Sequence, residues 1–161
     1  MKMKPTISLL AILGLAVVFA GVASAAVPAS GGASKHATLV IRHQLRGCHA
    51  WSVNGGVYKA SQTVAIHRGG WVSVTNNDVM PHKLVQTSGP AVAFSRLTAG
   101  TGMGLKRTFA PALLGRMGAA AKISFSHAGV YKFTTKPGED YMKGMKTIGA
   151  DNVLKLTVVV G

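Results

Sequence analysis

Beyond Lys35, apolar and polar residues alternate with a period close to two, which is the pattern of half-buried β-strands. Turn-forming groups such as Asn54-Gly55-Gly56 and Pro137-Gly138 separate these short runs. The pattern predicts strands at Thr38–Arg42, Gln62–Ile66, Trp71–Thr75, Lys83–Gln86, Ile123–Phe125, Tyr131–Thr134 and Val153–Val160. About seven short strands with regular turns are typical of an all-β sandwich. The Gly- and Ala-rich stretch 98–121 is the exception, and we expect it to form an insertion, irregular or with a short helix at Ala110–Met117.

The first 36 residues follow a different pattern. Lys2 and Lys4 precede an uncharged apolar run at 7–20, and Ala23-Ser24-Ala25 offers a small-residue cleavage site. These features predict a secretory signal peptide over 1–25, a flexible leader over 26–36 and one domain over 37–161. An uncleaved membrane anchor is the alternative, although the apolar run is short for a span. We therefore expect a secreted, periplasmic or envelope-associated protein with no membrane span after cleavage.

The charge balance is strongly basic. The 161 residues include 18 Lys and Arg against 4 Asp and Glu, a formal net charge of +14. Apolar residues make up 48% and charged residues 14%, which favours one compact domain over a disordered basic tail. Aromatic residues, at 6%, are too sparse for a nucleic-acid stacking platform, so nucleic acid is not an expected partner. We expect a monomer whose basic surface meets solvent, an acidic redox protein or an anionic cell-envelope surface.

Enzymatic chemistry has little support in this sequence. Glu139 and Asp140 are adjacent, so on a strand they would point to opposite faces instead of forming a catalytic carboxylate pair. The Gly-rich run at 100–104 has no preceding strand and no following Gly-Lys-Ser/Thr, which argues against a phosphate-binding loop. We therefore expect a binding or electron-carrier protein and not an enzyme.

Soft and imidazole ligands gather at three places. Cys48 lies between His43 and His49, His82 ends the segment 76–82, and Met142 and Met145 lie close together near the C-terminus. As the only cysteine of an exported chain, Cys48 is a buried inert thiol, an intermolecular disulfide or a metal ligand. Thiolate, imidazole and thioether together are the ligands that copper selects.

Two segments resemble the cupredoxins. Asn76-x-Asp78-x-x-Pro81-His82, between two predicted strands, resembles the first histidine-ligand loop of that family. Gly129-Val130-Tyr131-Lys132-Phe133, followed by a Pro-Gly and Met loop and a Val-rich strand, is similar to its last hairpin. The resemblance covers roughly residues 37–161. It implies a cupredoxin-like Greek-key β-sandwich in which His82 is a copper ligand.

The last hairpin departs from the family pattern. Plastocyanin-like members carry there a Cys, a His three residues later, and then a Met. Aligning Tyr131-Lys132-Phe133 places Thr135 and Gly138 at the Cys and His positions, and neither can replace those ligands. Either copper has been lost, or the ligands have moved.

Cys48 makes relocated ligands plausible. If the first strand continues regularly, Cys48 and His43 form a pair, and His49 lies with Trp51 on the other face. Gly47 would relax this constraint by turning the backbone.

The resulting expectation is a mononuclear copper site. Its candidate ligands are His43, Cys48, His49, His82 and, in the axial position, Met142. Electron transfer is the expected activity, while copper storage or delivery would use the same residues. A structural zinc site would use the same Cys and His set. A metal-free binding module that holds anionic envelope polymers or an acidic partner is the alternative of a different class.

Overall fold

The computed structural model describes residues 33–43, 49–104, 110–136 and 154–161. These residues all belong to one compact unit, Gly31–Gly161. The predicted signal peptide, Cys48 and Met142 lie outside the described residues, and so does Met145. Within the described part of the chain, no helix is long and apolar enough to cross a membrane.

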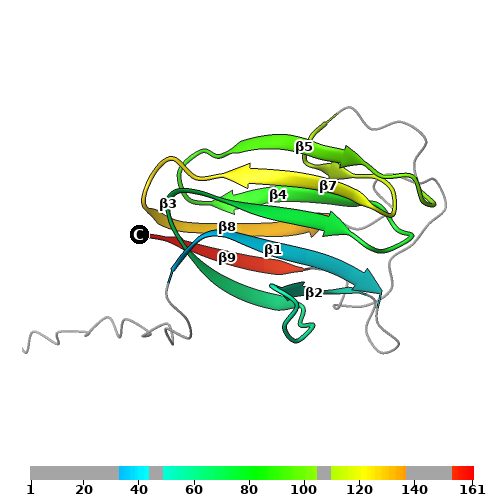
Figure 1. Cartoon of the computed structure of the whole chain (residues 1–161), viewed down its shortest axis with the longest axis horizontal. Helices are drawn as coiled ribbons and strands as arrows, with labels where there is room; N and C mark the ends of the chain where they lie inside the picture. Colours follow the sequence, from blue (N-terminus) through cyan, green and yellow to red (C-terminus); the bar gives the residue numbers. More distant parts are fainter. Residues whose placement is uncertain (1–32, 44–48, 105–109, 137–153) are drawn as a thin grey trace, which may run out of the picture. The chain divides into compact units, whose positions relative to one another are not determined.

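Nine strands make up the regular structure of the described residues (Figure 1). They are β1 (Ser34–His43), β2 (His49–Val53), β3 (Ser61–Asn76), β4 (His82–Ser88), β5 (Ala93–Ala99), β6 (Leu113–Leu114), β7 (Ala119–Ser124), β8 (Gly129–Lys136) and β9 (Lys155–Val160). All pairings are antiparallel except those of β3 with β1 and β9, which are parallel.

The long strand β3 joins two groups of strands. Its residues 61–66 pair with β9, and β9 continues through β8 and β4 to β6. Its residues 71–76 pair with β1 on one side and β7 on the other, so that β2-β1-β3-β7-β5 forms the second group. In Figure 1, β8 (orange) lies beside β9 (red), and β7 (yellow) lies beside β5.

Two glycines mark the change of direction in β3. Gly69 has a φ of 77°, a conformation that L side chains rarely adopt. A Cβ at Gly70 would come within 2.5 Å of the Lys35 carbonyl oxygen, so only glycine fits there. The bend therefore depends on Gly69 and Gly70, the pair whose sequence predicts a turn between two separate strands.

The inner faces of both strand groups supply one hydrophobic core. Strands β1, β3 and β7 contribute alternate side chains, and β4, β8 and β9 contribute theirs from the other group. Fully buried side chains of this core include Leu39, Ile41, Trp51, Ile66, Ile123, Phe125, Tyr131, Phe133, Leu154 and Leu156. The predicted all-β sandwich is therefore confirmed.

The predicted strands differ from the observed ones in three respects. The two strands predicted at Gln62–Ile66 and Trp71–Thr75 are one continuous strand, β3. Strands β2, β5 and β6 were not predicted. The short helix considered for Ala110–Met117 does not form, because that segment contains a turn and the two-residue strand β6. The described part of the expected insertion contains turns, β6 and the start of β7, and residues 105–109 lie outside the described residues.

Candidate metal centre

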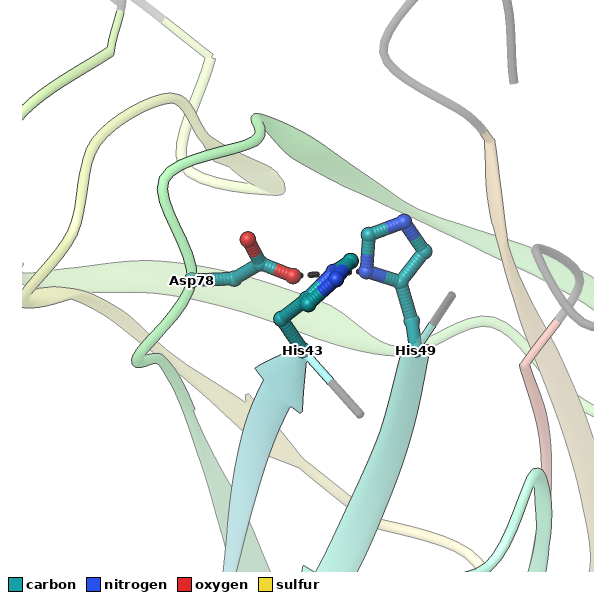
Figure 2. Close-up of side chains that lie close together, drawn as sticks. All are labelled: His43, His49 and Asp78. Atoms are coloured by element: carbon teal, nitrogen blue, oxygen red, sulfur yellow. Dashed lines mark hydrogen bonds and ion pairs between the residues drawn. The ribbon is translucent and has the colours of Figure 1, made fainter. Parts of the chain in front are cut away.

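Two histidines meet where β1 ends and β2 begins. His43 and His49 are directly opposite partners in the antiparallel β1–β2 register, so their side chains lie on the same face. Their ring centroids are 5.7 Å apart with an interplanar angle of 71°. Figure 2 shows both side chains rising from neighbouring strand ends toward Asp78. The pairing of β1 with β2 therefore places the two imidazoles side by side.

The loop between β3 and β4 is shaped by Asn76. Its side-chain amide donates hydrogen bonds to the carbonyl oxygens of Met80 (2.8 Å) and Leu114 (3.0 Å). Its side-chain oxygen accepts a hydrogen bond from the backbone N–H of Asp78 at 3.0 Å. Asp78 Oδ1 in turn accepts from the backbone N–H of Met80 at 3.1 Å. These local bonds are the turn chemistry that Asn and Asp favour, and they fix the Asp78 carboxylate in place.

The carboxylate of Asp78 joins the histidines of both strand groups. Its Oδ2 lies 2.6 Å from His49 Nδ1, within a buried hydrogen bond, and 3.5 Å from His82 Nε2. The rings of His49 and His82 meet edge to face, with centroids 4.7 Å apart. Residues from β1, β2, the 76–80 loop and β4 thus converge on one small volume.

This cluster lies at one end of the core. His43, His49 and His82 continue the rows of inward-facing residues that include Ile41, Trp51 and Leu84. His82 and Asp78 are each 1% exposed and His49 is 4% exposed, whereas His43 is exposed. The polar cluster is therefore held by the same strand alternation that builds the hydrophobic core.

Burial and hydrogen bonding act in opposite directions on Asp78. Burial alone raises the pKa of its carboxyl, but the side-chain contacts with His49 and His82, the Met80 N–H and the charge of His49 outweigh it. The pKa of Asp78 is therefore held well below its usual range, and the group is an ionised acceptor at neutral pH. Since an ionised carboxylate has no proton to donate, His49 Nδ1 must be the donor of the 2.6 Å bond.

His82 is shifted in the direction of its neutral form. Burial lowers the pKa of its imidazole, and the charge of His49 lowers it further, while Asp78 opposes both effects. A buried neutral imidazole offers a ring-nitrogen lone pair, which is the form that binds a metal ion.

We expect acid to destabilise the metal-free domain in two stages. The folded pKa of His82 lies below its ordinary value of 6.5, so the unfolded chain binds a proton first as the pH falls below 6.5. The carboxyl of Asp78 adds a second loss as the pH falls through and below its ordinary value of 3.8. Each group contributes up to about 1.4 kcal/mol per pH unit within its window. Urea midpoints measured between pH 7.5 and pH 3 test this, and a flat profile from pH 7 to pH 5 would contradict it.

Both ring nitrogens of His82 are buried without a hydrogen-bond partner among the described residues. Buried polar atoms are nearly always paired, and an unpaired one costs about 1–3 kcal/mol. One nitrogen from His43, one from His49 and one oxygen from Asp78 also lie within 4.8 Å of one another. These three donors fit a metal ion that accepts imidazole nitrogen. His82 lies beside them, and its ring nitrogens lack a hydrogen-bond partner among the described residues.

The structure brings together three of the residues predicted from the sequence, His43, His49 and His82. The expectation, made for a regular first strand, that His49 faces away from His43 is wrong. Strand β1 ends at His43, and His49 begins the returning strand β2 and pairs with His43. Asp78 was not predicted as a site residue, although its position four residues before His82 in the 76–82 motif was a signal.

Several solved structures are similar to this chain at low identity. No protein-family model matches the chain, and no curated protein matches it. An amicyanin variant in its reduced state matches at 16% identity and a TM-score of 0.38, over 81% of this chain and 83% of that one. A purple cupredoxin from Nitrosopumilus maritimus matches at 18% identity and a TM-score of 0.37, over 75% and 97%. The amicyanin of Paracoccus versutus matches at 18% identity and a TM-score of 0.36, over 85% and 87%.

The described strands form a β-sandwich with mixed parallel and antiparallel pairing. Within it, Thr135 is a buried residue of β8 that pairs in register with Leu84, two residues beyond His82. Its hydroxyl has no hydrogen-bond partner among the described residues. The position that the resemblance aligns with the family's cysteine thus holds a hydroxyl in this chain, and Cys48 is the one thiol available.

Proposed function

We propose that this protein is an exported, copper-binding electron carrier of cupredoxin-like fold. His43, His49 and His82 would supply imidazole nitrogens, and Cys48 would supply a thiolate. The observation that carries the proposal is the buried His82 ring, which has no hydrogen-bond partner among the described residues and lies 4.7 Å from the ring of His49. A site of imidazoles with a thiolate suits copper, whereas a site built mainly from carboxylates would suit harder ions.

Asp78 would position His49. Because Asp78 Oδ2 accepts the Nδ1 proton, the Nε2 atom of His49 is left as the ligand atom. A carboxylate partner of this kind fixes the ring orientation and raises the basicity of the imidazole. The Met80 N–H donates to that carboxylate, and the Asp78 backbone N–H donates to the Asn76 side-chain oxygen, so the loop holds Asp78 in place without a metal.

Copper would supply one-electron chemistry between its two oxidation states. The chain would supply a rigid setting, because three of the four site residues that the structure describes are buried and stand at strand ends or in a hydrogen-bonded loop. Little reorganisation then accompanies the change of oxidation state. With one mononuclear centre and no catalytic carboxylate pair, we propose a carrier and not an oxidase. Met142 is retained as the proposed axial ligand.

Cys48 decides between an electron carrier and a plain histidine site. We expect titration of the purified, reduced chain with Cu(II) to give a saturable one-equivalent visible absorption from thiolate to copper. Cys48→Ser should abolish that absorption, and the electron paramagnetic resonance spectrum should change to that of a site with nitrogen and oxygen ligands. His127→Gln, which changes an exposed turn histidine, is the matched control and should leave both signals intact. A folded chain that binds no copper would contradict the proposal.

A structural zinc site is the second candidate, favoured by the carboxylate within the His43, His49 and Asp78 group. Zinc would give no visible absorption, and a chelator would lower the unfolding temperature of the purified protein. A chelator-sensitive but colourless protein that still binds one metal after Cys48→Ser would favour zinc over copper.

A further inference from the structure

The described surface has no acidic side chain to balance its basic ones. The described residues contain a single Asp or Glu, which is Asp78, and it is buried in the histidine cluster. The only side-chain ion pairs found among the described residues are those of Asp78 with His49 and His82. Glu139, Asp140 and Asp151 lie outside the described residues, so further countercharge for the described lysines and arginines comes from those three residues, from solution or from a binding partner.

Three lysines lie on the outward face of one group of strands. Alternation along β4, β8 and β9 turns Lys83, Lys132 and Lys155 away from the core, because their neighbours Leu84, Phe133 and Leu156 are buried. Lys132 and Lys155 are exposed and Lys83 is half-buried. We call the outward side of β4, β8, β9 and residues 61–66 of β3 the lysine face.

The register sets the spacing of these charges. Lys132 is opposite Thr157, and Lys155 lies two residues before Thr157 on β9. Diagonal neighbours of this kind in an antiparallel pair have Cα atoms about 7–8 Å apart. Thr63 pairs in register with Thr157 on the other side of β9, so a row of hydroxyl side chains runs beside the charges. Lys132 and Lys155 thus lie close together on this face, with threonine hydroxyl groups beside them.

The side chains of the lysine face favour electrostatic contact over insertion. Val130 is the one large hydrophobic residue of this face that is strongly exposed, and the face carries no described aromatic side chain. Stable protein interfaces usually have aromatic or Arg anchors, and membrane-inserting faces have aromatic or large aliphatic ones. Neither kind of anchor is present among the described residues of the face.

We propose that the lysine face binds a linear phosphate-bearing polymer of the cell envelope. A lysine ammonium group pairs with phosphate as a point charge, and threonine hydroxyls donate to phosphate oxygens. A flexible chain of repeated phosphates can contact lysines on neighbouring strands of one sheet face. This inference is independent of the copper proposal, because the histidine cluster faces the inside of the sandwich and the lysine face is its outer side.

The test uses long-chain polyphosphate as the probe and the purified chain as the protein. Binding is measured at several salt concentrations for the wild type, for Lys83→Gln/Lys132→Gln/Lys155→Gln and for a matched control, Lys35→Gln/Lys59→Gln/Lys122→Gln. Both triple variants lose the same charge, but the control positions lie on β1, after β2 and on β7. The lysine-face variant should bind polyphosphate at least about tenfold more weakly than the wild type. The slope of its log binding constant against log salt concentration should become shallower by about 0.7 per lysine.

Several results would overturn the proposal. Equal losses in the two triple variants would show that net charge alone governs binding. Tighter binding to phosphatidylglycerol vesicles than to polyphosphate would assign the face to a membrane surface instead. No polyphosphate binding at low salt, with circular dichroism showing a folded protein, would remove the site altogether. Copper binding by the lysine-face variant should equal that of the wild type, which separates this test from that of the metal centre.

Discussion

His82→Leu should remove copper binding while leaving the stability of the metal-free protein close to that of the wild type. The imidazole of His82 is 1% exposed, and neither of its nitrogens has a hydrogen-bond partner among the described residues. Leucine has a similar volume and no polar atom to leave unsatisfied, but the variant loses the 3.5 Å contact of His82 Nε2 with the Asp78 carboxylate. These two effects oppose each other, so the free energy of unfolding without metal should change by less than about 1 kcal/mol. Urea unfolding of the metal-free proteins measures this directly.

Copper affinity should fall strongly in the same variant. Loss of a partner that only orients a ligand costs about 10–100-fold in metal affinity, so losing a ligand itself should cost more than about 100-fold. Competition against a chelator of known affinity gives the ratio. His67→Leu, an exposed histidine at the bend of β3, is the matched control and should alter neither property beyond experimental error. A marked loss of stability in His82→Leu would instead identify His82 as a structural histidine with a hydrogen-bond partner.

The sequence predicts most readily the strands that have one solvent-exposed side and one buried side. β1, β8, β9 and residues 61–66 of β3 alternate between buried and more exposed residues, so a period of two is visible. In residues 71–76 of β3 the alternation is one of apolar and polar side chains, although most of them are buried. β2 is buried on both sides over His49–Ser52, and nearly all of β5 is exposed. Neither shows alternation, which is why periodicity could not find them.

Turn signals misled the prediction at the centre of β3. Gly69-Gly70 reads as a turn, and it does change the chain direction, but hydrogen bonding continues on both sides of it. The difference is a tertiary effect, because each half of β3 pairs with a distant segment. A local sequence pattern carries no information about those partners.

The two parts of the candidate metal centre, the loop that carries His82 and the contact of His49 with Asp78, could be predicted to different degrees. His82 could be singled out because Asn76, Asp78 and Pro81 surround it in a local motif, and the hydrogen bonds of Asn76 show why that motif has its shape. The contact between His49 and Asp78 spans 29 residues and depends on how β1 and β2 pair. The expected side of His49 was wrong because the local sequence does not show where β1 ends and β2 begins, and the β1–β2 register is what places His49 opposite His43.

Asp78→Asn should weaken both the fold and the metal site. The amide keeps the shape of the carboxylate and can still accept the Met80 N–H, but it loses the charge that pairs with the buried histidines. Its amide nitrogen would also face the Nδ1–H of His49, placing two donors against each other. A buried hydrogen bond to a charged group contributes about 1.5–3 kcal/mol, so we expect a loss of that size in the free energy of unfolding.

The same variant separates an orienting role from direct ligation. If Asp78 orients His49, copper affinity should fall about 10–100-fold and the visible spectrum should keep its form, because the set of ligand atoms is unchanged. If the carboxylate is itself a ligand, the spectrum should change together with the affinity. Asn77→Ala, at an exposed neighbour whose backbone N–H bonds to the Ile41 carbonyl oxygen, is the matched control. Unchanged stability in Asp78→Asn would show that its contact with His49 contributes nothing to the fold, and the orienting role would be lost with it.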